Sequence, residues 1–116
     1  MGIDPSRTSA DLSAGELRLL AVATAAASSP RVLLLDEPSS GMSPPEAERL
    51  TGLVRELRGR GTAIVMVEHD FPFVTALADR VTVLDAGRVI AEGSPEEVAR
   101  DPAVLSAYLG SPEGAA

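Results

Sequence analysis

The stretch Val32-Leu33-Leu34-Leu35-Asp36-Glu37-Pro38 places four apolar residues directly before two carboxylates. A short apolar run of this kind is typical of a strand that is buried on both faces of a parallel sheet. Two adjacent acids at the mouth of a buried segment repel each other and lose part of their hydration, which costs free energy. We therefore expect a strand over Val32–Leu35 whose carboxyl end faces a positively charged group.

A second strand and two helices are expected around this stretch. Thr62–Val67 is apolar and rich in β-branched residues, and it ends at Glu68-His69-Asp70. Ser43-Pro44-Pro45-Glu46 has the pattern of a helix start, with a capping serine, proline in the first turn and glutamate three residues after the cap. The helix that it opens is expected to end at Gly59 and Gly61 and to bury Ala47, Leu50, Leu53, Val54 and Leu57. The helix before the first strand is expected from Ala14 to about Ser28, with apolar and small residues at helical spacing: Leu17, Leu20, Ala21, Thr24 and Ala27.

The last third of the chain continues the alternation of helices and strands. A short helix is expected over Phe73–Asp79, and the strands Val81–Leu84 and Arg88–Ala91 bracket a hairpin turn at Asp85-Ala86-Gly87. Ser94-Pro95-Glu96-Glu97 is a second capping box, and Asp101-Pro102 opens a last helix through Tyr108. Strands that alternate with helices predict an α/β fold with a parallel sheet.

Composition limits the classes of protein to consider. The 116 residues suffice for one domain with a core, and the net charge of −7 argues against a nucleic-acid binder. There is no cysteine, the longest uncharged stretch is far too short to span a bilayer, and no signal peptide is visible. We expect a soluble, intracellular chain. All ten basic residues are arginine, so the sequence contains no lysine.

The two apolar strands end in residues that can handle phosphate or metal. Ligands of parallel sheets bind beyond the carboxyl ends of the strands, so Asp36 and Glu37 would meet His69 there if the two strands are neighbours. An aspartate that holds Mg²⁺ through water, beside a glutamate that orients an attacking water, suits phosphoryl transfer. The alternative for each piece alone is a strand that runs into a solvated turn, and a structural or surface histidine.

The order of the motifs narrows these alternatives. Leu12-Ser13-Ala14-Gly15-Glu16 opens a helix, and it is followed by the Val32–Pro38 stretch, by Ser39-Ser40-Gly41-Met42-Ser43-Pro44 and then by Val67-Glu68-His69-Asp70. This series, from about Leu12 to Gly110, resembles the ATP-binding cassette (ABC) family of transporter ATPases, in which signature motif, Walker B, D-loop and H-loop follow one another in this order.

The resemblance implies a role for each motif. Asp36 would hold Mg²⁺ through water, Glu37 would be the catalytic carboxylate that polarises the attacking water, and His69 would be the switch histidine that contacts the γ-phosphate. The signature residues, which would contact the ATP held mainly by a second subunit, are Ser13, Ala14, Gly15 and Glu16. The D-loop, which would pass information between the two subunits, is formed by Ser40, Gly41, Met42 and Ser43 and runs up to Pro44.

The sequence departs from the family pattern in two respects. Ala14 and Glu16 replace a glycine and a glutamine of the usual signature; Glu16 either places a negative charge near the phosphate or turns away to cap the helix. The family's phosphate-binding loop requires a lysine, and its Q-loop a glutamine, and the sequence has neither. The resemblance therefore implies the C-terminal half of a nucleotide-binding domain, inactive as an ATPase on its own.

The expected fold is a partial P-loop NTPase, a three-layer α/β fold with a parallel sheet that lacks the phosphate-loop strand. Residues 1–11 would be a flexible leader or truncation edge, 12–110 the half domain, and 111–116 a disordered tail. In the family's sheet the missing strand is expected between the His69 strand and the Val81 strand. Its absence would leave an apolar edge, so an assembly or a partly ordered state is expected rather than a well-behaved monomer.

The C-terminal residues are similar to the ending of ATPases from branched-chain amino-acid importers, and lipopolysaccharide-export ATPases end similarly. The resemblance implies an ATP- and Mg²⁺-dependent subunit that couples hydrolysis to transport. Its partners would be a second nucleotide-binding domain, membrane permease subunits and the missing N-terminal half, with no nucleic acid. It would lie in the cytoplasm at the inner face of the membrane. The alternatives are a non-catalytic remnant or regulatory half and, less favoured, a lobe of a chromosome-maintenance ATPase head.

Overall fold

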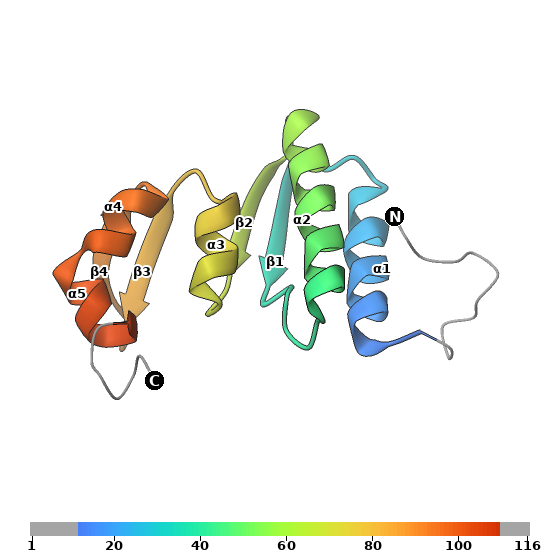
Figure 1. The fold of residues 1–116 in the computed structure, drawn as a ribbon. Helices are drawn as coiled ribbons and strands as arrows, with labels where there is room; N and C mark the ends of the chain where they lie inside the picture. The colour runs from blue at the N-terminus through green and yellow to red at the C-terminus, as the bar shows by residue number, and fades with distance from the viewer. Residues whose placement is uncertain (1–11, 110–116) are drawn as a thin grey trace. The chain divides into compact units, whose positions relative to one another are not determined.

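The computed structural model describes residues 12–109, which form two compact units that divide between His69 and Asp70 (Figure 1). The expected leader (1–11) and tail (111–116), together with Gly110, lie outside the described residues. The first unit carries the residues predicted to form the site, and the second carries the hairpin and the C-terminal helices.

The first unit is a parallel pair of strands with two helices. Its elements are α1 (Ala14–Ala26), β1 (Val32–Asp36), α2 (Pro44–Gly59) and β2 (Ala63–Val67). The strands pair in parallel with the register Val32↔Ala63 through Asp36↔Val67. This confirms the predicted α/β arrangement and the expectation that the two apolar strands are neighbours.

Capping boxes start three of the helices. Ser13, Ser43 and Ser94 cap α1, α2 and α4, and in each case the serine hydroxyl accepts from the backbone N–H of a glutamate three residues later. The side chain of that glutamate accepts in turn from the backbone N–H of the serine. Each box therefore satisfies two N–H groups that the helix itself leaves without partners, as predicted for Ser43 and Ser94.

The core of the first unit lies between the helices and one face of the strands. It is formed by Leu19, Val22, Ala26, Leu33, Leu35, Leu50, Val54 and Leu57. The expected stripe on α1 is wrong, since Leu17 and Leu20 remain exposed while Leu19, Val22 and Ala26 are buried. Apolar and small residues of α1 occupy most of its circumference, so more than one line of residues along the helix has helical spacing. Packing against α2 and β1 determines which of these lines is buried.

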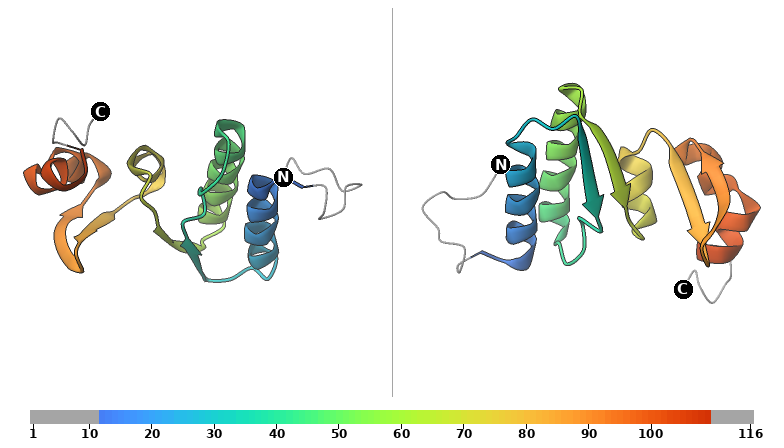
Figure 2. Two further views of the ribbon diagram at one scale, coloured as in Figure 1. Left: turned by 90° about the horizontal axis from the view of Figure 1, so that it is seen from below. Right: turned by 180° about the vertical axis from the view of Figure 1, so that it is seen from behind.

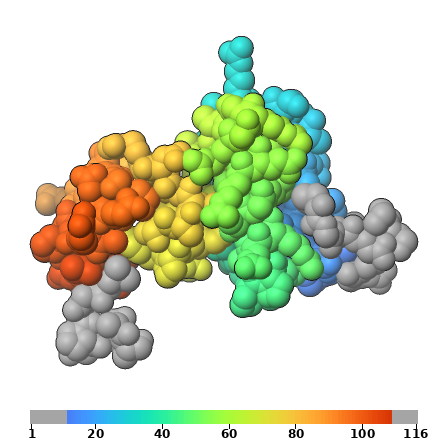
Figure 3. All heavy atoms as spheres, turned by 45° about the horizontal axis from the view of Figure 1, so that its top comes forward, coloured from blue at the N-terminus to red at the C-terminus, as the bar shows by residue number. Residues whose placement is uncertain are grey.

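The opposite face of the β1–β2 sheet carries no helix of this unit. Burial alternates along β1, where Leu33 is 6% exposed and Leu34 72%, and on β2 the residues Val65 and Val67 are exposed as well. The prediction that these strands are buried on both faces is therefore wrong for this chain. In the view from behind, β1 and β2 stand beside α2 and no helix of this unit lies in front of them (Figure 2, right), whereas in the space-filling view the green atoms of α2 are in front (Figure 3).

The second unit packs helices against an antiparallel hairpin. It comprises α3 (Phe71–Leu77), β3 (Val81–Asp85), β4 (Arg88–Gly93), α4 (Pro95–Arg100), α5 (Pro102–Val104) and a π-helical turn (Leu105–Leu109). The predicted hairpin is confirmed, because β3 and β4 pair through a turn in which Ala86 and Gly87 both have positive φ, 50° and 79°. Its core is formed by Val81, Val83, Ala91, Val98 and Val104.

Two helices of this unit differ from expectation. α3 begins at Phe71, two residues earlier than predicted, because the Asp70 carboxylate accepts from the Phe73 N–H and so caps the helix before Pro72. The last helix does start after Asp101, but from Leu105 it widens to π-helical geometry.

The described sheets are separate. β1 and β2 form one two-stranded sheet and β3 and β4 another, so among the described residues no strand bridges β2 and β3. Within residues 12–109, every helix is too short or too polar to serve as a membrane span.

The bare sheet face predicts self-association of the isolated 116-residue chain. We expect concentration-dependent assembly, and Leu34→Asp is expected to weaken it by about tenfold or more, since one interfacial leucine contributes on the order of 1.5 kcal/mol or more. Sedimentation velocity over a concentration series measures this. Leu17→Asp, on an exposed position of α1, is the control and should leave assembly unchanged. A monomer that melts sharply at all concentrations would contradict the prediction.

The capping box of α4 predicts a small loss of stability in acid. Hydrogen bonds from the Ser94 backbone and hydroxyl hold the pKa of Glu97 below its ordinary value of 4.5. A carboxylate whose pKa is lowered on folding stabilises the fold above its unfolded value, and this stabilisation is lost as pH falls through the folded value. We therefore expect the free energy of unfolding of Glu97→Gln to lie below that of the parent chain at pH 7 and to approach it below about pH 4.5. Urea unfolding at a series of pH values from 7 to 3 measures this difference. A stability difference that stays constant across this range would refute the box's ionic contribution.

Candidate functional site

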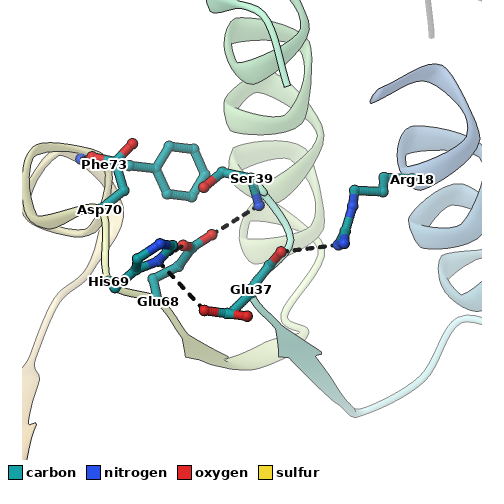
Figure 4. Close-up of polar contacts among 7 residues, drawn as sticks. All are labelled: Arg18, Glu37, Ser39, Glu68, His69, Asp70 and Phe73. Atoms are coloured by element: carbon teal, nitrogen blue, oxygen red, sulfur yellow. Dashed lines mark hydrogen bonds and ion pairs between the residues drawn. The ribbon is translucent and has the colours of Figure 1, made fainter. Parts of the chain in front are cut away.

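Glu37 and His69 meet at the carboxyl ends of β1 and β2. Glu37 is the first residue after β1, and His69 is the second residue after β2. Nδ1 of His69 lies 3.4 Å from Oε1 of Glu37, and both side chains remain open to solvent, 72% and 51% exposed (Figure 4). The parallel register produces this contact, because Asp36 and Val67 are paired at the strand ends. The structure therefore brings the two predicted catalytic residues together.

The backbone of Glu37 is held in an unusual conformation. Its φ is +47°, in the left-handed region that non-glycine residues rarely adopt. Its N–H donates to the Val67 carbonyl at 2.7 Å, and its carbonyl accepts from the Ser40 N–H at 3.1 Å and from Nη1 of Arg18 at 3.0 Å. These bonds hold the chain where it leaves the sheet, at the residue that contacts His69.

Two further residues of this cluster had no role assigned from the sequence. Arg18 on α1 reaches the Glu37 carbonyl, and Glu68 accepts a hydrogen bond from the Ser39 N–H at 2.8 Å (Figure 4). Glu68 was recognised as polar, but only the structure reveals that its side chain is fully buried. Arg18 gives no signal in the sequence beyond an arginine on a predicted helix.

Asp36 ends β1 as an exposed carboxylate beside Glu37 in the chain. Within the described residues, no group of three or more histidine or carboxylate side chains is placed to hold a metal ion. Mg²⁺ in phosphoryl-transfer sites is commonly bound by one or two carboxylates together with water and phosphate oxygens. The exposed Asp36 carboxylate fits a magnesium ion shared with a phosphate, and does not fit a metal held by the protein alone.

The predicted signature residues lie at the N-terminus of α1. The Ser13 hydroxyl accepts from the Glu16 N–H at 3.1 Å, and the Ser13 N–H donates to Oε1 of Glu16 at 3.0 Å. Of the two orientations left open for Glu16, this geometry is the one in which it caps the helix. The N–H groups of a helix start attract anions, and here a carboxylate of the chain takes one of the free N–H groups.

Glu46 of α2 joins the same helix start. Its Oε2 accepts from the Ser13 hydroxyl at 2.6 Å, while its Oε1 accepts from the Ser43 N–H at 2.9 Å. The hydrogen bond from the Ser13 hydroxyl, followed by those from Ser43, lowers the pKa of Glu46 below its ordinary value. One carboxylate thus links the predicted signature motif to the end of the predicted D-loop.

The carboxylate of Glu46 approaches Gly15 closely. A Cβ on Gly15 would lie 2.3 Å from Oε1 of Glu46, so a side chain at this position would require the Glu46 carboxylate to move. The adjacent Ala14 is exposed and begins the helix. In this conformation, the group that lies close to the backbone of the predicted signature motif is therefore the Glu46 carboxylate of the same chain.

The predicted D-loop is a tight turn between β1 and α2. The Ser40 N–H donates to the Glu37 carbonyl, and the Met42 N–H donates to the Ser39 carbonyl at 3.1 Å. Gly41 has a φ of 75°, which suits glycine, and Ser43 caps α2. The turn thus connects the end of β1, where Glu37 contacts His69, to the start of α2, where Glu46 contacts Ser13. Both groups of predicted site residues belong to the first unit.

Comparison with known proteins agrees with this arrangement. A family model described as "AAA domain, putative AbiEii toxin, Type IV TA system" matches residues 1–76, and one described as "Branched-chain amino acid ATP-binding cassette transporter" matches residues 88–114. The chain is 39% identical over 106 residues to the high-affinity branched-chain amino acid transport ATP-binding protein LivG of Salmonella typhimurium. It is 35% identical to BraF of Pseudomonas aeruginosa, also a branched-chain amino acid transport ATP-binding protein.

These matches cover most of this chain and less than half of each relative. The LivG and BraF alignments include 90% of this chain and 42% of the relative, so the chain spans about 42% of the length of these curated relatives. Among solved structures, the ADP conformation of MJ1267, an ATP-binding cassette of an ABC transporter, superposes with a TM-score of 0.79 at 30% identity. That match includes 90% of this chain and 43% of the MJ1267 chain.

The expected fold class is confirmed by these structures, since the chain has the partial P-loop NTPase fold of an ABC ATPase. The chain belongs to the AAA-domain family whose model spans residues 1–76, and it is a C-terminal ABC ATPase portion that resembles the ATPases of branched-chain amino-acid importers.

Proposed function

We propose that this chain supplies the hydrolytic and signature residues of an ATPase that drives an ABC transporter, an importer of branched-chain amino acids. The observation that carries the proposal is the 3.4 Å contact between Nδ1 of His69 and Oε1 of Glu37 at the carboxyl ends of two parallel strands. Polar groups at this edge of an α/β sheet lie where ligands bind. The likeness to LivG and BraF supports the transported class.

In this proposal Glu37, His69 and Asp36, at the ends of β1 and β2, each act on ATP in a defined way. The Glu37 carboxylate accepts a hydrogen bond from the attacking water and orients it. His69, on the neighbouring strand end, contacts the γ-phosphate and responds to its loss. Asp36 would hold Mg²⁺ through water, and the ion would neutralise charge that develops on the phosphate oxygens.

The second cluster acts on the ATP of a partner domain. Ser13, Ala14, Gly15 and Glu16 would face that nucleotide, and the turn formed by Ser40, Gly41, Met42 and Ser43 would couple the two sites. Because the Ser13 hydroxyl donates to Glu46, a phosphate can take this donor only after Glu46 releases it. Engagement of the partner's ATP therefore requires a shift of the Glu46 side chain.

The proposed partners follow from what the chain does not contain. A phosphate loop with lysine must come from another part of the protein or from another chain, since the 116 residues include no lysine. A second nucleotide-binding domain and membrane permease subunits complete the assembly, which would lie at the cytoplasmic face of the membrane. No nucleic acid is expected, given the net charge of −7.

A second candidate function is that of a regulatory half without hydrolysis of its own. The absence of lysine favours it for the chain taken alone. Such a half would pair with an intact ATPase and present the α1 N-terminus to it. The two candidates differ in whether Glu37 is needed for turnover once a phosphate loop is supplied.

The test is a chimaera in which this chain replaces the matching 42% of Salmonella typhimurium LivG. We expect the chimaera to hydrolyse ATP, and Glu37→Gln to lower kcat by about 10²- to 10⁴-fold, the usual contribution of a general base. Phosphate release from purified protein is the measurement, and the 116-residue chain alone is expected to release none.

Glu48→Gln, an exposed acid on α2, is the matched control and should leave kcat unchanged. ATP binding by each chimaera, measured by fluorescence, verifies that the part contributed by LivG is folded. A chimaera that binds and hydrolyses ATP equally well with and without Glu37→Gln would exclude the hydrolytic role of this cluster.

A further inference from the structure

Glu68 is the most deeply buried charged side chain of the site cluster. Its side chain is 0% exposed, although it is flanked in space by the open side chains of His69 and Glu37. Burial of a carboxylate costs free energy unless hydrogen bonds or opposite charges compensate. Its two oxygens therefore need to be accounted for separately.

One oxygen has a backbone partner. Oε2 accepts from the Ser39 N–H at 2.8 Å, a bond of the charge-assisted kind. Glu68 directly follows β2, whereas Ser39 lies in the turn after β1. The bond thus ties the two segments that carry His69 and Glu37 to each other (Figure 4).

The other oxygen is buried without a hydrogen-bond partner. Oε1 of Glu68 is buried and accepts no hydrogen bond, and Nδ1 of His69 lies 3.9 Å from it. Nδ1 of His69 also faces Oε1 of Glu37 at 3.4 Å. Two carboxylate oxygens on one side of a ring nitrogen favour a proton on that nitrogen, because a lone pair there would be repelled.

We propose that Glu68 is a positioning residue, which clamps the turn at Ser39 to the end of β2 and, together with Glu37, keeps the proton of a neutral His69 on Nδ1. Nε2 is then the nitrogen of His69 that points away from the carboxylates. The proposal does not rest on the proposed function, because the clamp and the tautomer are properties of this chain without nucleotide.

Glu68→Gln separates the clamp from the tautomer. The Gln amide oxygen can still accept from the Ser39 N–H, but its NH₂ group donates and would face Nδ1, which favours the other tautomer. Glu68→Ala removes both effects. Glu48→Gln, which changes the same functional group on the exposed surface of α2, is the control for charge alone.

The experiment is NMR of the 116-residue chain and its variants in the Leu34→Asp background at about pH 8, where an ordinary imidazole is neutral. His69 is the one histidine of the sequence, so long-range ¹H–¹⁵N correlations report its tautomer without overlap. Hydrogen exchange of the Ser39 amide reports the clamp.

We expect Nδ1–H to predominate in the parent and the Nε2–H share to rise by about twofold or more in Glu68→Gln, with Ser39 exchange retained. Glu68→Ala is expected to speed Ser39 exchange by about fivefold or more, the effect of losing one net hydrogen bond. If Glu68→Ala does not fold, Glu68→Gln decides alone. An unchanged His69 tautomer in Glu68→Gln would overturn the proposal, as would unchanged Ser39 exchange in a folded Glu68→Ala.

Neither readout uses ATP, so this result and that of the chimaera are independent. A chimaera without activity would refute the proposed function and leave the clamp intact, whereas a failed clamp would leave the roles of Glu37 and His69 untouched.

Discussion

The parallel pairing of β1 with β2 is the constraint on which the rest of the site depends. Since Asp36 lies opposite Val67 in the register, the residues that follow each strand leave the sheet side by side. A shift by one residue would reverse the faces of a strand and move its end. The buried leucines of β1, Leu33 and Leu35, fix this register by packing against the helices, so burial on one face of the sheet determines which polar residues meet at its edge.

Three carboxylate side chains of the first unit accept hydrogen bonds at the strand ends and at the helix starts. Glu68 joins the two strand ends, Glu16 caps α1, and Glu46 links the starts of α1 and α2. The Ser13 hydroxyl and the Ser13 and Ser43 N–H groups lie at helix starts, where such donors can also bind a phosphate. Under the proposed function, nucleotide engagement at Ser13 would therefore involve an exchange of hydrogen-bond partners.

Much of the fold follows from local sequence rules, because the capping boxes, the hairpin turn and the alternation of elements depend on residues close in the chain. Ser43 with Glu46 and Ala86-Gly87 are examples. The buried stripe of α1 could not be predicted in this way, since Leu17 and Leu19 are equally apolar and only packing against α2 and β1 distinguishes them.

For the site, the contact of Glu37 with His69 follows from the sequence if the two apolar strands are neighbours, because parallel strands end at the same edge of a sheet. The roles of Arg18, Glu46 and Glu68 could not, because each contacts a residue between 19 and 33 positions away in the chain. The exposure of Leu34 could not be predicted either, because the sequence of an apolar strand does not indicate whether a further layer covers its second face.

The most direct test of the account is disulfide trapping across β1 and β2 in this cysteine-free chain. Leu34 and Val65 are register partners with exposed side chains, so their Cα atoms should be about 5 Å apart, within reach of a disulfide, whereas Leu34 and Val67 should be about 8 Å apart. We expect rapid intramolecular oxidation of the Leu34→Cys/Val65→Cys variant and little oxidation of the Leu34→Cys/Val67→Cys variant. Equal oxidation of the two pairs, or a preference for the second, would contradict the register that brings Glu37 to His69.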